Sequence, residues 1–335
     1  MKWQSHYRFP EERNPILMNS ESQKNFGIFA VLATVLPAFV RLGRLVRAQG
    51  WIYSKLPCFV AGVAYALCCR SAAVLRDLGD GLCLVLMFLL LASLGHLAND
   101  FSDLEIDRLV GKVRAVARWA AWQLRMMLGL LSLGVIGLAA MRYGLQASAV
   151  AAACVVVGLA YSLPPSRLKE RGYWGWLAAA LAQRALPSAL GFAALETWNA
   201  TAICFCLHGL VVGIRAMVVH QLSDRADDLA VGVKTVATEL SPERLESWLK
   251  GVIWPAEMGL TLLLTGLLAV QFPWLGLCAV VFVLWQQRGV KTRGLWVPRL
   301  NDDLDQFYRV VWGGVLCLTG IGFHLLRFLR PGDLS

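Results

Sequence analysis

The chain has 335 residues, of which 57% are hydrophobic and 16% are charged, and its mean hydropathy is +0.57. Soluble domains contain about 45–50% apolar and about 25% charged residues, so this composition excludes a protein built only of soluble domains. The formal net charge is +10, but no nucleic-acid-binding motif accompanies it, and contact with a membrane surface accounts for the basic excess. The sequence therefore predicts an all-α polytopic membrane protein that does not bind nucleic acid.

Nine apolar stretches are long enough, or nearly long enough, to cross a bilayer as helices, which takes about 20 residues. In chain order they are 51–69, 81–99, 119–141, 145–162, 174–195, 199–219, 247–270, 272–288 and 309–328. A tenth run, 26–40, is shorter and contains Pro37, so we expect an interfacial helix there rather than a span.

Basic residues are divided unequally between the loops that these nine spans create. Of the 32 Lys and Arg residues, 21 fall on the side of the N-terminus and 4 on the other side. Because cytoplasmic loops carry the excess of basic residues, this division predicts a cytoplasmic N-terminus and a C-terminus on the opposite side.

The loop after the second span begins with oxygen-bearing side chains at helical spacing. Asn99, Asp103 and Asp107 recur every four residues, with Asp100 beside them, so a continuing helix would place the first three on one face. Mg²⁺ takes one or two carboxylates, keeps several waters and fills its octahedron with phosphate oxygens. This loop is therefore a candidate magnesium site.

A second acidic cluster follows the sixth span. Asp224 and Asp228 are again four residues apart, and Gly232, Lys234 and Thr235 come shortly after. The lysine is suited to meet a phosphate as a point charge. Either loop alone is equally well explained as a solvated acidic helix end. Because both lie at a membrane boundary on the same predicted side, together they favour a two-site metal clamp on a diphosphate.

At these residues the sequence resembles the UbiA superfamily of intramembrane prenyltransferases. The family motif NDxxDxxxD is matched by Asn99, Asp100, Asp103 and Asp107, and the motif DxxxD with GxKT is matched by Asp224, Asp228, Gly232, Lys234 and Thr235. A third motif, YSxPPxRxK, is matched by Tyr161, Ser162, Pro164, Pro165, Arg167 and Lys169. The chain departs from the family at KVRAVAR, where Arg114 takes the basic position of the usual NRP but Ala115 replaces its proline.

The resemblance implies nine helices around a central, lipid-accessible cavity with the active site on the cytoplasmic side. Residues 49–330 would form this single domain, preceded by a cytoplasmic segment, 1–48. It implies Mg²⁺ as cofactor, and as metal-binding and catalytic residues Asn99, Asp103, Asp107, Asp224 and Asp228, with Asp100 as a further ligand. The basic side chains implied to assist at the diphosphate are those of Lys112, Arg114, Arg167 and Lys234.

Four further residues are candidate substrate-binding groups, each with a structural alternative. Arg184 and Arg215 lie inside spans, where a charge needs a partner or a task, so each either meets a substrate or pairs with a loop carboxylate. Tyr161 and Ser162 could hold an acceptor, but YSxPP is also a helix end stopped by two prolines.

Three functions remain open at this point. The leading hypothesis is transfer of a prenyl group from an allylic isoprenyl diphosphate, through a carbocation, to an aromatic or other lipophilic small-molecule acceptor. A terpene cyclase on the same scaffold would ionise the same diphosphate and quench the cation internally. A secondary transporter using Arg184 and Arg215 as anion sites is less well supported, because the acidic clusters lie at the membrane boundary rather than at the midplane.

Overall fold

Long helices make up the computed structural model, which describes residues 43, 47, 51–70, 74–109, 111, 114–230, 232–290 and 304–328. No strand occurs among these residues, so the all-α prediction is confirmed. Seven helices are long and apolar enough to cross a membrane: Val74–Ser102, Ala121–Tyr143, Leu145–Ser162, Tyr173–Ala194, Ala200–Ala230, Pro242–Gln271 and Leu304–Leu326. The predicted interfacial helix at 26–40 lies outside the described residues.

Two shorter apolar helices, Leu56–Cys68 and Pro273–Leu284, coincide with the first and eighth predicted spans. The bounds in chain order are α4 Leu56–Cys68, α5 Val74–Ser102, α6 Leu104–Leu109, α7 Ala121–Tyr143, α8 Leu145–Ser162, α9 Tyr173–Ala180, α10 Leu186–Ala194, α11 Ala200–Ala230, α12 Val236–Glu239, α13 Pro242–Trp248, α14 Trp254–Gln271, α15 Pro273–Val290 and α17 Leu316–Phe328. Short 3₁₀ turns lie at Ala115–Arg118 and Leu168–Glu170.

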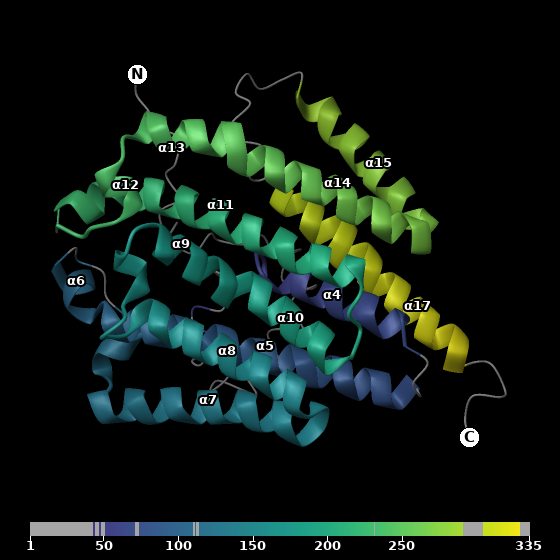
Figure 1. Ribbon diagram of the computed structural model, residues 1–335, viewed down its shortest axis with the longest axis horizontal. Helices are drawn as coiled ribbons and strands as arrows, with labels where there is room; N and C mark the ends of the chain where they lie inside the picture. Colours follow the sequence, from purple (N-terminus) through teal and green to yellow (C-terminus); the bar gives the residue numbers. More distant parts are fainter. Residues whose placement is uncertain are drawn as a thin grey trace, which may run out of the picture.

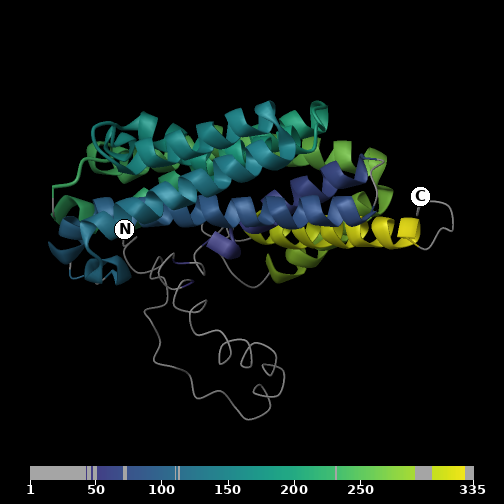
Figure 2. The same ribbon diagram turned by 90° about the horizontal axis from the view of Figure 1, so that it is seen from below.

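The helices run roughly along one common direction (Figure 1), and their contacts close into a ring. Starting from α5, each helix contacts the next in the order α5, α7, α8, α9–α10, α11, α14, α15, the last helix and α4, which returns to α5. Figure 2 shows the same bundle from a second side, with its helices again running lengthwise. Successive helices along the chain are mostly neighbours, because their connections are short.

Apolar side chains lie on both the inner and the outer surface of the bundle. Leu84, Met87 and Leu264 are fully buried, whereas Leu133, Leu262 and other large apolar side chains are exposed on the outside. An outer surface of this kind is suited to lipid tails. Together with the seven apolar helices, it makes the chain an integral membrane protein.

Close helix contacts depend on small residues at particular positions. At Gly213 on α11, an added Cβ would lie 2.6 Å from the Cα of Ala180 on α9. Only a glycine lets the two backbones approach this closely, as small residues do between membrane helices generally. This contact fixes α11, which carries the second acidic motif, against α9.

Three of the long helices contain π-helical segments, at Leu181–Ala185, Leu249–Ile253 and Tyr308–Val315. The first joins α9 to α10, the second joins α13 to α14, and the third precedes α17. Each widens its helix locally without ending it. Arg184 lies in the first of these segments and Tyr308 in the third.

Two helices extend beyond the predicted spans at the ends that carry the acidic motifs. α5 continues to Ser102 and α11 continues to Ala230, so Asn99, Asp224 and Asp228 are all helical. α6 follows the first of these helices and α12 follows the second, and Figure 1 shows both short helices at the same end of the bundle. The loop after α11 is packed by its own apolar cluster, in which Val236, Ala237 and Leu245 are buried.

Candidate active site

The first acidic motif follows one helical path from α5 into α6. The amide of Asp103 donates to the carbonyl of Asn99 at 3.1 Å, and the amide of Asp107 donates to that of Asp103 at 2.8 Å. These bonds between residues four apart are those of an α-helix, although Asp103 itself lies at the junction of the two helices. The side chains of Asn99, Asp103 and Asp107 therefore share one face.

Two basic side chains of the third motif bind this face. Lys169 donates to Asp103 Oδ1, to Asn99 Oδ1 at 3.2 Å and to the hydroxyl of Ser102 at 3.0 Å. Arg167 donates to the same Asp103 oxygen at 3.3 Å and to the Ser102 carbonyl at 3.2 Å. The loop after α8 is thus fastened to the first acidic motif by charge-assisted hydrogen bonds.

The backbone of this loop is unusual at Arg167. Its φ of +36° lies in the left-handed region, which is costly for a residue that carries a side chain. Such a conformation persists only where surrounding contacts determine it, and here Arg167 also pairs with Glu170 at 2.5 Å. Burial lowers the pKa of Lys169 from its ordinary value, while the neighbouring Asp103 acts in the opposite direction.

Arg114 neutralises the far end of the first motif. Its Nε lies 2.5 Å from Asp107 Oδ2 and its Nη2 lies 3.1 Å from Asp107 Oδ1, a two-point contact. The hydrogen bonds to Asp107 raise the pKa of the Arg114 guanidinium above its usual value. Asp100 is buried, 3.9 Å from Arg114 and 3.4 Å from Arg47. Arg114 therefore lies near two carboxylates. Although Ala115 replaces the proline of the family motif, the basic group is still present at the site.

The second acidic motif occupies the last turns of α11. Asp224 lies 3.6 Å from the ring of His220, and Asp228 accepts a hydrogen bond from the hydroxyl of Thr235 at 3.5 Å. Thr235 is also the N-cap of α12, where it accepts from the Thr238 amide at 3.3 Å. Lys234 is exposed beside this turn. Lys112 lies outside the described residues.

The donors of the two motifs fit a hard cation in their chemistry. They are amide and carboxylate oxygens, which Mg²⁺ prefers. Within the described ranges, no three His, Cys, Asp or Glu side chains are grouped so as to hold a metal ion by themselves. A magnesium site needs only one or two carboxylates when phosphate oxygens and waters complete it. The Asp103 carboxylate also accepts from Lys169 and Arg167.

Tyr161 and Ser162 of the third motif are the last two residues of α8. Ser162 is fully buried, and its hydroxyl has no hydrogen-bond partner among the residues that the structure describes. The Tyr161 hydroxyl lies 4.0 Å from the sulfur of Met217. The helix that they end, α8, contacts α9 and the 3₁₀ turn Leu168–Glu170 in the following loop.

Arg215 is held in a polar network, which fits the ion-pair alternative given for it above. Its guanidinium lies 2.7 Å from Glu257 and 2.5 Å from Asp305. Asp305 belongs to the predicted loop between the spans 272–288 and 309–328, whereas Glu257 is a partner that was not predicted. The Tyr308 hydroxyl donates to Glu257 at 2.8 Å. Glu257 lies within the predicted span 247–270, and this intramembrane carboxylate was the available signal for an internal ion pair.

Arg184 faces a small internal cavity of about 20 Å³, room for about one water molecule. The lining residues include Lys55, Gln183 and His208 together with Phe59 and Phe88. Their helices meet near the middle of the bundle (Figure 1). Along α5, Phe88 of this lining and Asn99 of the first acidic motif lie 11 residues apart, or about 16 Å.

Comparison with known proteins identifies the family to which this chain belongs. The family model described as the UbiA prenyltransferase family matches residues 56–294. The chain belongs to this family. The matched region contains all three motifs, the acidic helices and the loop that carries Arg167 and Lys169. No curated protein sequence matches the chain significantly.

Solved structures of UbiA homologues share the fold at low sequence identity. A homologue from Archaeoglobus fulgidus bound to GPP and Mg²⁺ is 15% identical with a TM-score of 0.61, over 85% of this chain and 99% of the other. The same homologue bound to Cd²⁺ gives a TM-score of 0.57 at 16% identity, over 85% and 99% of the two chains. A digeranylgeranylglyceryl phosphate synthase structure gives 0.53 at 14% identity, over 86% and 99%. At these identities the likeness establishes the fold.

Proposed function

We propose that this UbiA-family protein transfers a prenyl group from an allylic isoprenyl diphosphate to a small-molecule acceptor, with Mg²⁺ as cofactor. One observation carries the proposal: the two acidic helix ends lie at the same end of the bundle, and basic side chains already contact the first motif (Figure 1). The homologue from Archaeoglobus fulgidus has been solved with GPP or DMAPP and Mg²⁺, which supports the same substrate class here.

The motif residues divide into two roles in this proposal. The metal-holding oxygens are those of Asn99, Asp100, Asp103, Asp107, Asp224 and Asp228. The cationic groups for the diphosphate are those of Lys112, Arg114, Arg167 and Lys234. Lys169 joins the second group, because it already donates to Asn99 and Asp103. Its three ammonium protons can be shared between a carboxylate and a phosphate.

Loss of the diphosphate is the difficult step, and the residues act on its charge. Bound Mg²⁺ supplies Lewis-acid neutralisation of the leaving group. The guanidinium groups of Arg114 and Arg167 donate to oxygens on which negative charge develops as the C–O bond breaks. The apolar interior beneath them, with Phe59 and Phe88 stacked at 4.7 Å, keeps water from the allylic cation. The acceptor then supplies the electron pair and loses a proton.

The acceptor is proposed to be aromatic or otherwise lipophilic, since it must reach the site through the bundle. Of the candidate contacts, Arg215 already has two carboxylate partners and acts structurally in this proposal. Tyr161, Ser162 and Arg184 remain candidate acceptor contacts. Ser162 carries a buried hydroxyl that lacks a partner within the described chain, as a group that awaits a ligand would.

The membrane arrangement is part of the same proposal. Residues 49–330 form one transmembrane domain of nine spans, in which α4 and α15 supply the two short spans, after an N-terminal segment 1–48. The distribution of basic residues supports a cytoplasmic N-terminus and an active site on the cytoplasmic side. Labelling of single introduced cysteines from either side of sealed vesicles would test this orientation.

A terpene cyclase remains the second candidate, favoured by the aromatic side chains inside the bundle. Phe59, Phe88 and Phe205 line the internal cavity, and aromatic faces stabilise a migrating cation. Purified protein incubated with Mg²⁺ and farnesyl or geranylgeranyl diphosphate, without acceptor, distinguishes the two. We expect little turnover until a phenolic or other lipophilic acceptor is added, whereas a cyclic hydrocarbon or alcohol would establish cyclisation.

Charge-neutral substitutions in the motifs test the ionisation step itself. Asp103→Asn and Asp228→Asn should each lower Mg²⁺-dependent pyrophosphate release by about a hundredfold or more, as loss of a charge-stabilising group does. Glu105→Gln and Asp227→Asn are the matched controls, because both residues are exposed neighbours outside the motif positions. Pyrophosphate release that persists in EDTA, or equal losses in controls and motif variants, would contradict the proposal. Absence of release with every diphosphate tested would favour the transporter instead.

A further inference from the structure

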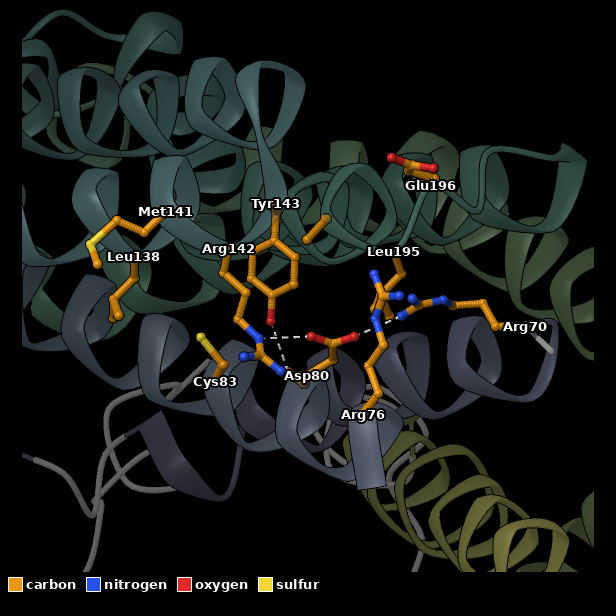
Figure 3. Close-up of a pocket in the computed structure, with 11 residues that line it drawn as sticks. Arg70, Arg76, Asp80, Cys83, Leu138, Met141, Arg142, Tyr143, Leu195 and Glu196 are labelled. Atoms are coloured by element: carbon orange, nitrogen blue, oxygen red, sulfur yellow. Dashed lines mark hydrogen bonds and ion pairs between the residues drawn. The ribbon is translucent and has the colours of Figure 1, made fainter. Parts of the chain in front are cut away.

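A second cavity, of about 680 Å³, opens at the end of the bundle away from the acidic motifs. It lies where α4 meets α5, where α7 meets α8 and where α10 ends, and Figure 3 shows its lining. Three of the lining residues are arginines: Arg70, Arg76 and Arg142. A volume of this size is typical of small-molecule and cofactor sites.

One buried carboxylate orients two of these arginines. Asp80, only 3% exposed, lies 2.8 Å from Nε of Arg142 and 3.0 Å from Nη1 of Arg70. The hydroxyl of Tyr143 donates to the Asp80 carbonyl at 3.1 Å. A guanidinium has five N–H donors, so Arg142, which reaches Asp80 through Nε, can also donate to a further acceptor.

The backbone of α5 makes room for this arrangement. An added Cβ at Gly79 would lie 3.0 Å from Nη2 of Arg142, so the guanidinium rests against a position without a side chain. Arg142 also lies over the ring of Tyr143, with its guanidinium carbon 5.9 Å from the ring centroid. The orientation of Arg142 is therefore fixed by contacts on three sides.

The cavity carries more positive than negative charge. Figure 3 shows Asp80 between Arg142 on one side and Arg70 and Arg76 on the other, with Glu196 apart from them. Asp77 lies outside the lining, fully buried, 3.8 Å from Arg70 and 3.7 Å from His324. Among the lining residues, three arginines stand against two carboxylates, Asp80 and Glu196, so the lining carries one positive charge in excess. Like charges gathered around one cavity favour an anion between them.

We propose that this cavity binds a phosphate group, and that the group belongs to the head of a membrane phospholipid. Guanidinium forks match phosphate oxygens with paired hydrogen bonds. The wall beside them is apolar, formed by Leu138, Met141 and Leu195, and Met141 is 89% exposed toward the surroundings of the bundle. An acyl chain can follow that wall outward while its phosphate stays at the arginines.

The proposed lipid site is distinct from the diphosphate site. Asp80 and Asp103 are 23 residues apart on a nearly continuous helical path, or about 34 Å at 1.5 Å per residue. This separation is close to the thickness of a bilayer's hydrocarbon core, about 30 Å. The two sites thus lie at opposite membrane interfaces, where phosphate headgroups are found.

The test measures lipid binding to the purified full-length protein in a neutral detergent, with EDTA and no isoprenyl diphosphate. Phosphatidylglycerol is titrated against thermal stability and against lipid adducts in native mass spectrometry, with inorganic phosphate as a parallel arm. Arg76→Gln removes one exposed guanidinium without breaking an ion pair to Asp80, and Arg125→Gln makes the same charge change at an exposed position outside the cavity.

We expect Arg76→Gln to weaken phosphatidylglycerol binding about tenfold or more, and Arg125→Gln to leave it unchanged. A stability shift with phosphatidylglycerol but not with inorganic phosphate identifies the lipid as the occupant, and equal shifts identify the phosphate group alone. Equal affinities of wild type and Arg76→Gln, or no binding of either probe, would overturn the proposal. Melting temperatures without ligand show whether the variants remain folded.

Discussion

Replacing Glu257 by alanine removes the centre of the internal polar network. Glu257 is fully buried and binds both the Arg215 guanidinium, at 2.7 Å, and the Tyr308 hydroxyl, at 2.8 Å. The network joins α11, α14 and the last helix, so it ties the last helix to two helices that lie beyond α15 in the ring. In this variant Arg215 keeps its ion pair with Asp305.

The expected cost follows from the burial of these groups. Removing one member of a buried ion pair costs about 3–5 kcal/mol, because the other charge is left poorly compensated. Asp305 keeps part of the compensation, so we expect about 3 kcal/mol. With an unfolding entropy of about 2.1 cal/mol/K per residue, a chain of this length would melt about 4 °C lower.

The assay is thermal unfolding of the purified protein in detergent, followed by tryptophan fluorescence. Glu246→Ala is the matched control, since the partly exposed Glu246 lies in the same long helix and pairs with the exposed Lys250. That pair should contribute no more than about 0.5 kcal/mol. Replacing Arg215 and Glu257 together by methionine should restore part of the loss, because the uncompensated charge disappears. Equal melting temperatures for Glu257→Ala and Glu246→Ala would refute the reasoning.

Two further predictions concern helix packing and the loop after α8. Gly213→Ala should destabilise the protein by about 1–3 kcal/mol, because the added Cβ overpacks against α9. Gly137→Ala is its control in the same melting assay. Nothing lies within 4 Å of the added Cβ there, so this variant should be neutral or stabilising. Lys169→Gln should lower kcat/KM for the diphosphate about tenfold or more, because Lys169 donates at the first acidic motif. Arg171→Gln should not, because the Arg171 guanidinium donates to the Pro165 carbonyl instead. Equal kinetics for these two lysine and arginine variants would remove Lys169 from the site.

Hydrophobic length and helical spacing were sufficient to predict most of the fold. The predicted span 145–162 coincides with α8, and 272–288 differs little from α15. The predictions for α5 and α11 ended too early, because carboxylates lower hydropathy without ending a helix. The same spacing predicted that Asn99, Asp103 and Asp107 share a face, as their backbone hydrogen bonds require.

Ion pairs between residues far apart in the chain could not be predicted from the sequence. Nothing near Arg215 indicates that Glu257, 42 residues away, and Asp305, 90 residues away, are its partners. Arg70, Arg76 and Arg142, which line the second cavity, come from separate segments of the chain, and folding brings them to one cavity. Long-range pairing of this kind depends on helix rotation and on crossing geometry, which one sequence does not specify.

The π-helical segments have a consequence for how this protein can vary in length. A π turn holds one residue more than the α-helical turn it replaces, so each of the three affected helices contains a surplus residue. Loss of one residue there lets the turn tighten while the flanking halves keep their orientation. The same deletion in the middle of α7 would rotate everything beyond it by about 100° and turn its lipid-facing side inward. Single-residue insertions and deletions among relatives should therefore concentrate at these three places.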